Sequence, residues 1–506
     1  MTKPIRAQSP LKFLAPHFNP LVLAAIYRLL PFYLRSQCQI ERVEGENSEI
    51  LVDCYRRFQA GQLRFLLAYR HSSTNDPPSL IHYLHTNLPK IAANEGISLN
   101  KPVFGYFLYD RGIPLWGGPV ANWLLPAIGG VPVIRGRPDF GCLRTLRHLY
   151  VRGQFPLAIA PEGYTNGHGE LVSRLELGCA QTSFWCVEDL VAAGENQQVS
   201  IVPIGVRYQY LENPWPKIWQ LCRAIERECG FPPGDGANRQ LEQSLSSREW
   251  NPEQQLTPEE EALLYPKLLR IAEYLLEQME SFYRRFHTNL QLEEQAAKLA
   301  NLSPIEGLTL RLQGLMDAVL KMLEGYLQMQ PHSDRNLIER AHDIEDTVWD
   351  CIYRRDVDIQ TLSDVERGLA DLVASEAHEH LWHMRWVENF VVVTGHYLQN
   401  KPTARRFAET LLMINALIHE ITGRGQARPA IAPQKAIITV AEPLDVTARW
   451  HSTYQRDGTA KKQIDDKPLT LGTKYDVKTR NFTHDRRYQR HRDHYFAECL
   501  GGLVSL

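Results

Sequence analysis

Four short apolar runs, separated by helical or loop segments, constrain the fold of this chain more than any other feature. They are Phe65–Tyr69, Val131–Ile134, Phe155–Ala160 and Ser200–Val206. Runs of this length, bounded by polar or turn residues, pair as strands that are buried on both faces of a sheet. Strands that alternate with helical segments indicate an α/β sheet with crossover connections. The sequence therefore predicts an α/β fold, with a mixed sheet flanked by helices.

The first run ends in the stretch RHSSTNDPP, which places His71 at the strand's end and Asp76 five residues later. In open α/β sheets, ligands bind in the crevice outside the carboxyl ends of the strands, so a histidine there can meet a substrate. Asp76, followed by two prolines, also suits the start of a helix. A core histidine and a capping aspartate would explain the pair without any activity, since the 18 histidines make roughly one HxxxxD by chance.

Charged residues also follow the second and third runs. The second run delivers Arg135, with Arg137 two residues further on. Guanidinium groups are permanently charged and bind phosphate or carboxylate oxygens in a bidentate manner, which makes both arginines candidate substrate-binding residues; a solvated loop is the alternative. The third run delivers Pro-Glu-Gly, with Glu162 and Gly163. Such a turn aims the carboxylate at a crevice rather than at bulk solvent.

The composition excludes several classes of function. With 44 % hydrophobic and 23 % charged residues, the chain resembles a soluble globular protein, and its 506 residues suffice for two or three domains. A net charge of −2 gives no general basic face, so no nucleic-acid partner is expected. The nine cysteines form no CxxC pair, which argues for reduced thiols in a cytoplasmic compartment and against a zinc site. We expect no metal and no cofactor.

The N-terminal segment, residues 1–45, is predicted to be helical. Its most apolar part, Leu21–Leu34, is interrupted by Arg28 and Pro31, and it falls short of the roughly 18 to 20 apolar residues that a spanning helix requires. Leucines and aromatic residues flanked by arginine suit a helix that lies in a membrane interface. Packing of this helix against its own domain is the alternative.

Residues 46–213 form the main part of the predicted α/β domain. Asn47 is the expected N-cap of a helix that precedes the first strand, and residues 101–130, dense in glycine, proline and aromatic side chains, are expected to be loop-rich. Residues 214–256 include the sequence GFPPGDG and are predicted to be a linker.

Residues 257–423 are predicted to form an all-α helical bundle. Thr257, Ser303 and Ser363 each precede a glutamate by three residues, the spacing of a capping box, and Gly423 is the expected end of the last helix. Apolar residues then recur at intervals of three and four, which places them on one face of each helix. The bundle is a large insertion, because a later strand is expected to return to the first sheet.

Polar residues on the bundle helices also suggest a metal site. They are Glu339 and His342 on one predicted helix, and Glu376, Glu379, His380 and His383 on another. A di-metal centre needs two Glu-x-x-His pairs and two further carboxylates on facing helices, and only one such pair is evident. A polar helix face is therefore the preferred interpretation.

The return strand is the β-branched run Lys435–Val440, within residues 424–460. An isolated strand is not stable, so we expect it to join the α/β sheet. The remaining residues, 461–506, are basic and have little apolar periodicity, and they are predicted to be poorly structured, with contact to anionic lipid as an alternative.

Taken in this order, the blocks resemble the glycerolipid acyltransferase family, in particular 1-acylglycerol-3-phosphate acyltransferases. His71 and Asp76 match the HxxxxD block of that family, and in GGVPVIRG the residue Arg135 stands where the family has a phosphate-contacting arginine. The sequence Pro-Glu-Gly at 161–163 matches the start of the third block, and 201–204 matches the fourth. KAIITVAEPLDV is similar to the family's last strand. The resemblance covers about residues 63–208 and 435–450 and leaves out the bundle.

Two features depart from the family pattern. The third block usually continues Glu-Gly-Thr-Arg, whereas this chain has Tyr164 and Thr165 after the glycine. A second phosphate contact would have to come from Arg137 or Arg174, or the acceptor is not a phosphate. The family also commonly ends in an amphipathic helix, which the basic tail does not resemble.

The resemblance implies an acyltransferase that uses acyl-CoA or acyl-carrier protein as co-substrate and a lysophospholipid as acceptor, most simply 1-acyl-sn-glycerol 3-phosphate. His71 would be the general base, Asp76 its partner, and Arg135 and Glu162 would orient the acceptor. Such an enzyme is expected to be cytoplasmic and peripheral at the inner face of a membrane. A catalytically silent lipid-binding or scaffold protein, and a metal enzyme built in the bundle, are the alternatives.

Overall fold

The computed structural model describes residues 5–134, 139–165, 167–172, 175–232, 236–287, 302–330, 335–391, 396–424 and 428–456. The strands are β1 (Ile40–Glu46), β2 (Leu63–Tyr69), β3 (Tyr106–Asp110), β4 (Val131–Val133), β5 (Leu157–Ile159), β6 (Gln198–Tyr210), β7 (Gln434–Val440) and β8 (Leu444–Asp445).

The helices of the first part of the chain are α1 (Pro20–Ser36), α2 (Ser48–Gln59), α3 (Asp76–His82), the π-helical turn η1 (Tyr83–Asn87), α4 (Leu88–Asn94), α5 (Ile113–Ala127), α6 (Phe140–Arg152) and α7 (Gly178–Ala192). Those of the second part are α8 (Trp215–Glu228), α9 (Gly236–Ser247), α10 (Pro258–Phe286), α12 (Pro304–Tyr326), α13 (Leu337–Ile352), α14 (Asp364–Val391), α15 (His396–Asn400), α16 (Ala404–Ile421) and α17 (Val446–Arg456).

Within the described residues, the strands form one mixed sheet of eight, in the order β1-β7-β6-β2-β5-β3-β4, with β8 paired to β6. The central strand β2 runs parallel to both neighbours, β5 and β6, whereas β7 is antiparallel to β6 and parallel to β1. The predicted mixed α/β fold is therefore confirmed. Each of the four apolar runs contributes residues to a strand of this sheet, because their side chains have no polar face to turn to water.

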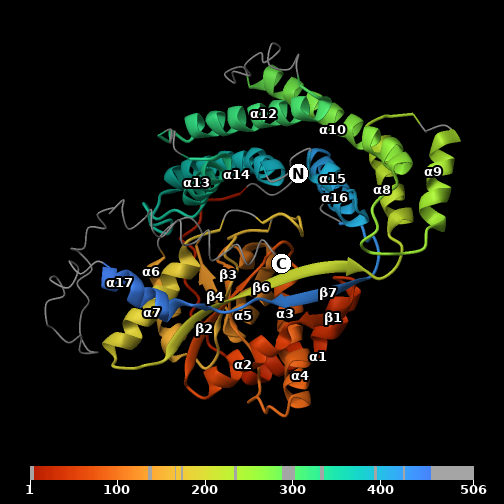
Figure 1. The fold of residues 1–506 in the computed structure, drawn as a ribbon. Coiled ribbons are helices and arrows are strands. Elements are labelled where there is room, and N and C mark those ends of the chain that lie inside the picture. Colours follow the sequence, from red (N-terminus) through yellow and green to blue (C-terminus); the bar gives the residue numbers. More distant parts are fainter. Residues whose placement is uncertain are drawn as a thin grey trace.

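Helices cover the sheet (Figure 1). Helix α2 packs against β2 through Tyr55 and Phe58, whose rings meet Phe65 edge to face at 5.1 and 5.6 Å between centroids. Tyr150 of α6 bonds to Ser183 of α7 and to a carbonyl of β6. In Figure 1 the helices α1 to α4 lie below the sheet, and α10 to α16 lie above it.

The strand expected at residues 435–440 forms as β7 and lies between β6 and β1 in the first sheet. Its backbone pairs with β6 from Ile204 to Tyr210. Because β6 precedes the helices from α8 to α16 and β7 follows them, the helical part is inserted between two adjacent strands. Both ends of the insertion therefore leave from the same region of the sheet.

The bundle helices begin where their capping spacings predicted. Reciprocal side-chain and backbone hydrogen bonds join Thr257 with Glu260, Ser303 with Glu306, and Ser363 with Glu366. A further capping box, Asn336 with Glu339, opens α13 and was not predicted. Helix α16 ends at Ile421, and Gly423 adopts a left-handed φ of 65°, which glycine tolerates without strain.

The prediction of a linker at residues 214–256 is wrong, because this segment forms α8 and α9. Trp215, Ile218 and Trp219 of α8 are buried in the core of the bundle, and the ring of Trp215 packs on Phe407 of α16. The apolar residues recur at intervals of three and four among polar ones, which is the pattern of an amphipathic helix. The sequence GFPPGDG falls between the end of α8 at Glu228 and the start of α9 at Gly236.

Three local predictions were also wrong. The N-terminal segment 1–45 is only partly helical, because α1 spans Pro20–Ser36 and the strand β1 begins at Ile40. The segment 101–130 is not mainly loop, since it contains β3 and α5, the latter kinked at Gly118 with φ 70°. Asn47 precedes α2, but its side chain makes no capping bond and donates instead to the carbonyl of Val440 on β7. Among the described residues, no helix is long and apolar enough to cross a membrane. The tail at 461–506 lies outside the described residues.

Candidate active site

His71 and Asp76 lie at the carboxyl end of the central strand. His71 follows β2 by two residues, and Asp76 begins α3, so the loop between them folds back over the strand end. The imidazole Nδ1 is 3.4 Å from Asp76 Oδ2, and the histidine side chain is 21 % exposed while that of Asp76 is fully buried. Catalytic hydrogen bonds are often long in structures without substrate, so this spacing suits a histidine whose other nitrogen meets the reactant.

Asp76 does not cap the helix through its side chain, which corrects the expectation of an N-cap. The capping position is Asn75, and the Asp76 carboxylate contacts three other groups instead. Oδ2 accepts a hydrogen bond from the backbone N–H of Ser73 at 2.7 Å in addition to facing His71. Oδ1 accepts from the hydroxyl of Tyr208 at 2.5 Å. A buried carboxylate with these partners has one orientation only.

Tyr208 is a site residue that the sequence analysis missed. It lies on β6, next to β2 in the sheet. Burial raises the pKa of Tyr208 well above its ordinary value, and the neighbouring charge of Asp76 raises it further, so the phenol stays protonated and donates. The sequence held a signal for this role. Tyr208 shares one face of the strand with Ile204 and Val206, and a tyrosine hydroxyl on an otherwise apolar face needs a hydrogen-bond partner.

Glu162 follows β5, the other neighbour of β2, and reaches the same strand end. Its side chain is 1 % exposed, and Oε1 accepts a hydrogen bond from the backbone N–H of His71 at 3.2 Å. The same oxygen lies 3.6 Å from Nε of Arg70. In this structure the carboxylate therefore holds the segment that carries the histidine. Its predicted role as a substrate-binding residue stays a prediction.

Arg70 is a second residue that sequence reasoning missed. Its side chain is 8 % exposed, and besides facing Glu162 it donates from Nη2 to the carbonyls of His168 and Leu171, at 3.0 and 2.5 Å. A charge at the end of an otherwise apolar run, directly before His71, needs a buried partner, and this could have indicated its role. Arg70 thus joins the histidine-bearing strand to the loop that follows Glu162.

That loop begins at Gly163, whose left-handed φ of 72° and N–H bond to the carbonyl of Ala160 make the turn after β5. Tyr164 stands where the family that the chain resembles has threonine. Its ring packs edge to face against His342 of α13, with 5.4 Å between centroids. The N–H of Gly167 bonds to the carbonyl of Ser72. The loop therefore contacts both the histidine-bearing segment and the bundle.

The two predicted arginines, Arg135 and Arg137, lie outside the described residues, as does Arg174. Strand β4, which precedes Arg135, pairs in parallel with β3. The carboxyl ends of β2, β5, β3 and β4 share one edge of the sheet, since these four strands run parallel to one another. The assignment of Arg135 and Arg137 as substrate-binding residues stays a prediction.

Helix α16 of the insertion is bound to the loop after Glu162 by buried charges. Glu409 accepts hydrogen bonds from the backbone N–H of Gly169, the guanidinium of Arg405 and the hydroxyl of Tyr397. His168 lies with Nδ1 3.8 Å from the same carboxylate. Burial alone would raise the pKa of Glu409, but the charge of Arg405 and the surrounding donors lower it to about 2. The insertion is thereby fixed to the candidate site.

A polar cavity of about 570 Å³ lies between the sheet and the insertion. It meets the candidate site at Arg70 and Tyr208, and three further cations, Arg207, Lys401 and Arg405, line it. Glu170 lines it too and pairs with Arg406 of α16. Glu253 lines the cavity as well, and the cations of the cavity pair with carboxylates. A cavity of this size and polarity has the chemistry to admit a polar group.

Two of the polar residues singled out on the bundle helices bond to tyrosines. Glu376 accepts from the hydroxyl of Tyr326, and Nδ1 of His383 lies 2.6 Å from the hydroxyl of Tyr283. Burial lowers the pKa of His383 to about 4. Within the part of the chain that the structure describes, no group of three or more His, Cys, Asp and Glu side chains is placed to hold a metal ion.

Comparisons of the chain with protein-family models, with curated proteins and with solved structures each found no match.

Proposed function

We propose that this protein is an O-acyltransferase that moves a fatty acyl group from acyl-CoA or acyl-carrier protein to the hydroxyl of a lysophospholipid, with 1-acyl-sn-glycerol 3-phosphate as the first acceptor to test. One observation carries the proposal. His71 stands at the carboxyl end of the central strand with one nitrogen turned to a fully buried carboxylate, 3.4 Å away, and with part of its ring open to solvent. This is the arrangement of a positioned general base.

The chemistry follows from that arrangement. The carboxylate of Asp76 keeps the proton of the neutral imidazole on Nδ1, which leaves Nε2 free to accept one. As Nε2 of His71 takes the proton of the acceptor hydroxyl, the oxygen attacks the thioester carbonyl and forms a tetrahedral intermediate. The carbon–sulfur bond then breaks, and the imidazolium returns its proton to the leaving thiolate. The products are an ester and a free thiol, and no nucleophilic serine or cysteine is required because the thioester is already activated.

The groups around the pair support this role by holding it in place. Tyr208 and the N–H of Ser73 fix the Asp76 carboxylate, and Glu162 and Arg70 fix the segment that carries His71. A base that is held in one orientation converts part of the bimolecular encounter into a positioned reaction. We assign binding of the acceptor phosphate to Arg135 and Arg137. An acceptor without phosphate is the alternative within the same reaction class.

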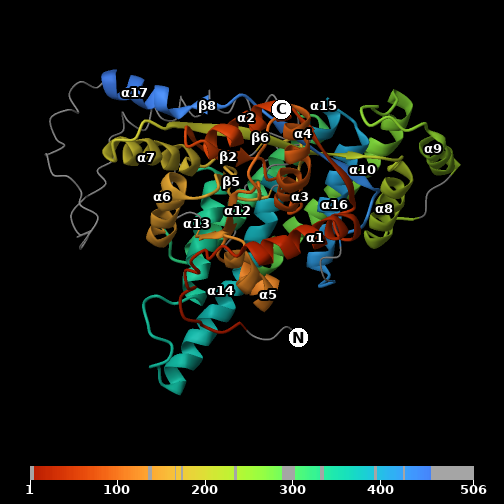
Figure 2. The same cartoon turned by 90° about the horizontal axis from the view of Figure 1, so that it is seen from below.

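Contact with a membrane surface is part of the proposal, since the lysophospholipid acceptor and the ester product are membrane lipids. Helix α1 exposes Leu21 and Phe32, at 79 % and 73 %, and carries the basic residues Arg28 and Arg35. Trp123 of α5, a helix that packs near α1 (Figure 2), is 57 % exposed. Large exposed apolar residues beside basic ones suit a helix that lies on an anionic bilayer.

The test is a panel of acyl transfer reactions. Purified full-length protein is incubated with isotopically labelled oleoyl-CoA or oleoyl-acyl-carrier protein and with lysolipids that do or do not carry a terminal phosphate, and the products are identified by mass. We expect labelled phosphatidic acid from 1-acyl-sn-glycerol 3-phosphate. Products from phosphate-free acceptors alone would change the acceptor class. If lipids bind and no donor yields any ester, the protein is a lipid-binding scaffold and the proposal is wrong.

A further inference from the structure

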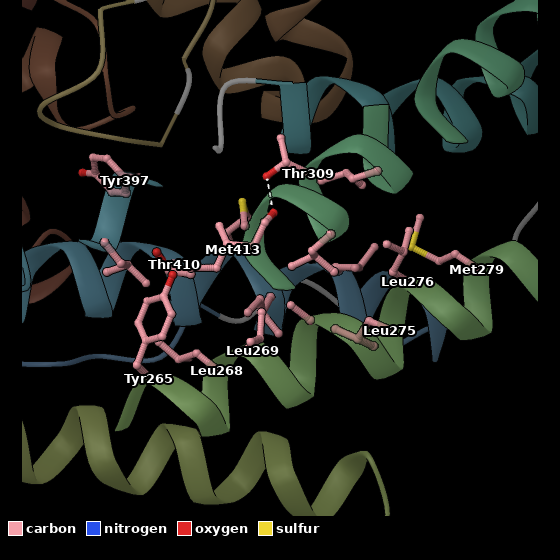
Figure 3. A pocket seen from close by; sticks show the side chains of 17 residues that line it. Tyr265, Leu268, Leu269, Leu275, Leu276, Met279, Thr309, Tyr397, Thr410 and Met413 are labelled. Atoms are coloured by element: carbon pink, nitrogen blue, oxygen red, sulfur yellow. Dashed lines mark hydrogen bonds between the residues drawn. The ribbon is translucent and has the colours of Figure 1, made fainter. Parts of the chain in front are cut away.

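The helical insertion contains a second cavity that the proposed reaction does not use. It has a volume of about 120 Å³ and lies between α10, α12 and α16, with α15 at one end (Figure 3). Its walls are leucine, isoleucine, methionine and alanine side chains, with hydroxyls from Tyr265, Thr309 and Thr410 and the ring of Tyr397. Protein interiors are close-packed and leave few voids larger than a water molecule, so a space of this size is unusual in a bundle core.

The cavity is long rather than round. Along α10 its lining runs from Tyr265 to Met279 at intervals of one and three residues, which follows one face of the helix. At 1.5 Å per residue this face is about 21 Å long. Several lining residues, among them Leu269 and Met413, are only half-buried, so the space opens to the outside. A narrow apolar slot of this length suits an extended hydrocarbon chain better than a compact ring.

The two ends of the slot differ in polarity. Tyr265, Tyr397 and Thr410 gather at one end, whereas Leu276 and Met279 lie at the other (Figure 3). Pockets that are mostly apolar with a few placed polar groups are typical of ligand sites, because the polar groups fix the ligand's direction. The polar end of a bound chain would therefore lie beside Tyr397, with its tail between α10 and α12.

The polar end is also the one connected to the candidate active site. Tyr397 donates a hydrogen bond from its hydroxyl to Glu409, which also accepts one from the N–H of Gly169. The ring of Tyr397 packs edge to face on His168, with 5.2 Å between centroids. The carbonyl of His168 accepts from Arg70, the residue before His71. A continuous set of packed and bonded groups thus runs from the slot to the histidine.

From these observations we propose that the insertion binds one fatty acyl chain in this cavity, with its polar end at Tyr397 and Thr410. The inference does not depend on acyl transfer, because a binding measurement reads it directly. Two kinds of molecule can supply the bound acyl chain. It belongs either to an acyl thioester or to a free fatty acid that is held in the insertion.

The test uses cis-parinaric acid, a fluorescent fatty acid, titrated into the purified full-length protein. We expect saturable binding of one chain per protein. Ala272→Phe places a ring in the cavity from α10 and should weaken binding at least tenfold, whereas Gln278→Phe adds the same ring at an exposed position of the same helix and should leave binding unchanged. Thr309→Leu fills the cavity from α12 and serves as a second variant, because the Thr309 hydroxyl bonds only within its own helix in Figure 3.

Competition identifies the source of the chain. Displacement of the probe at lower concentrations of oleoyl-CoA than of oleate assigns the cavity to a thioester, and the reverse order assigns it to a free fatty acid; either outcome supports the site. Circular dichroism of each variant checks that its helices are retained. Absence of saturable binding, or equal binding by the wild type, Ala272→Phe and Thr309→Leu with their helices intact, would overturn the inference.

Discussion

Tyr208 donates a hydrogen bond of 2.5 Å to Oδ1 of Asp76, and the two residues are 132 positions apart in the chain. The bond crosses from β6 to the start of α3, so it locks the carboxylate against the neighbouring strand. Because Oδ1 is occupied, only Oδ2 faces His71. The orientation of the candidate base is therefore set by a residue outside the HxxxxD block.

The first prediction concerns His71. Replacing it by alanine removes the proposed general base and should lower the rate of acyl transfer by at least roughly 100-fold, the usual contribution of a positioned base. The rate is measured as release of free thiol from the acyl donor. His148→Ala on α6 removes a histidine elsewhere in the domain and should leave the rate unchanged. A His71→Ala protein that retains a near wild-type rate would rule out the mechanism.

The second prediction concerns Tyr208 as a positioning residue. Tyr208→Phe removes one hydrogen bond to a buried charge, worth about 1.5 kcal/mol, so we expect kcat to fall roughly tenfold with little change in KM. Tyr210→Phe removes a hydroxyl two residues along the same strand and is the matched control. Equal effects of the two variants on kcat, or an effect on KM alone, would mean that the Asp76 bond does not serve catalysis.

The third prediction concerns Glu409 and pH. The folded-state pKa of Glu409 is lowered to about 2, so its ion pair contributes stability above the ordinary pKa and loses it as the pH falls toward 2. Glu409→Gln leaves Arg405 without its charged partner and should lower the free energy of unfolding at pH 7 by about 3 to 5 kcal/mol. The difference from the wild type should narrow below about pH 4.5, where the unfolded carboxylate begins to protonate.

Urea denaturation at a series of pH values measures the free energy of unfolding of the wild type and of Glu409→Gln. Glu253→Gln is the matched control, because Glu253 is 65 % exposed and lies 3.8 Å from Lys401. An exposed pair of this kind contributes about 0 to 1 kcal/mol. A constant difference between wild type and Glu409→Gln from pH 7 to pH 3 would contradict the assignment of a depressed pKa.

The fourth prediction concerns the membrane surface. Phe32→Glu on α1 places a negative charge among the exposed apolar residues and should reduce sedimentation with vesicles of phosphatidylglycerol and phosphatidylcholine at least severalfold. Helix α14 exposes a second apolar group that includes Leu369, 60 % exposed, so Leu369→Glu is the control. If Leu369→Glu abolishes vesicle binding and Phe32→Glu does not, the membrane-facing side has been assigned to the wrong helix.

Local signals in the sequence predicted the elements well where short-range physics decides. The strand that ends just before His71, the capping boxes at Thr257, Ser303 and Ser363, and the stop at Gly423 all depend on neighbours within a few residues. The same reasoning failed for Asn47, because its side chain bonds to Val440, 393 residues away. A capping residue can be recognised locally only when no distant partner competes for it.

The sequence by itself determined the α/β character of this protein, the helical nature of the insertion, and the placement of His71 at a strand end. These follow from apolar periodicity and turn chemistry, which act over a few residues. Only the tertiary structure decided which side chains hold the histidine pair. Tyr208, Arg70 and Glu409 act through partners brought together by strand order and by docking of α16, and a buried charge or hydroxyl reveals its partner only after the chain has folded.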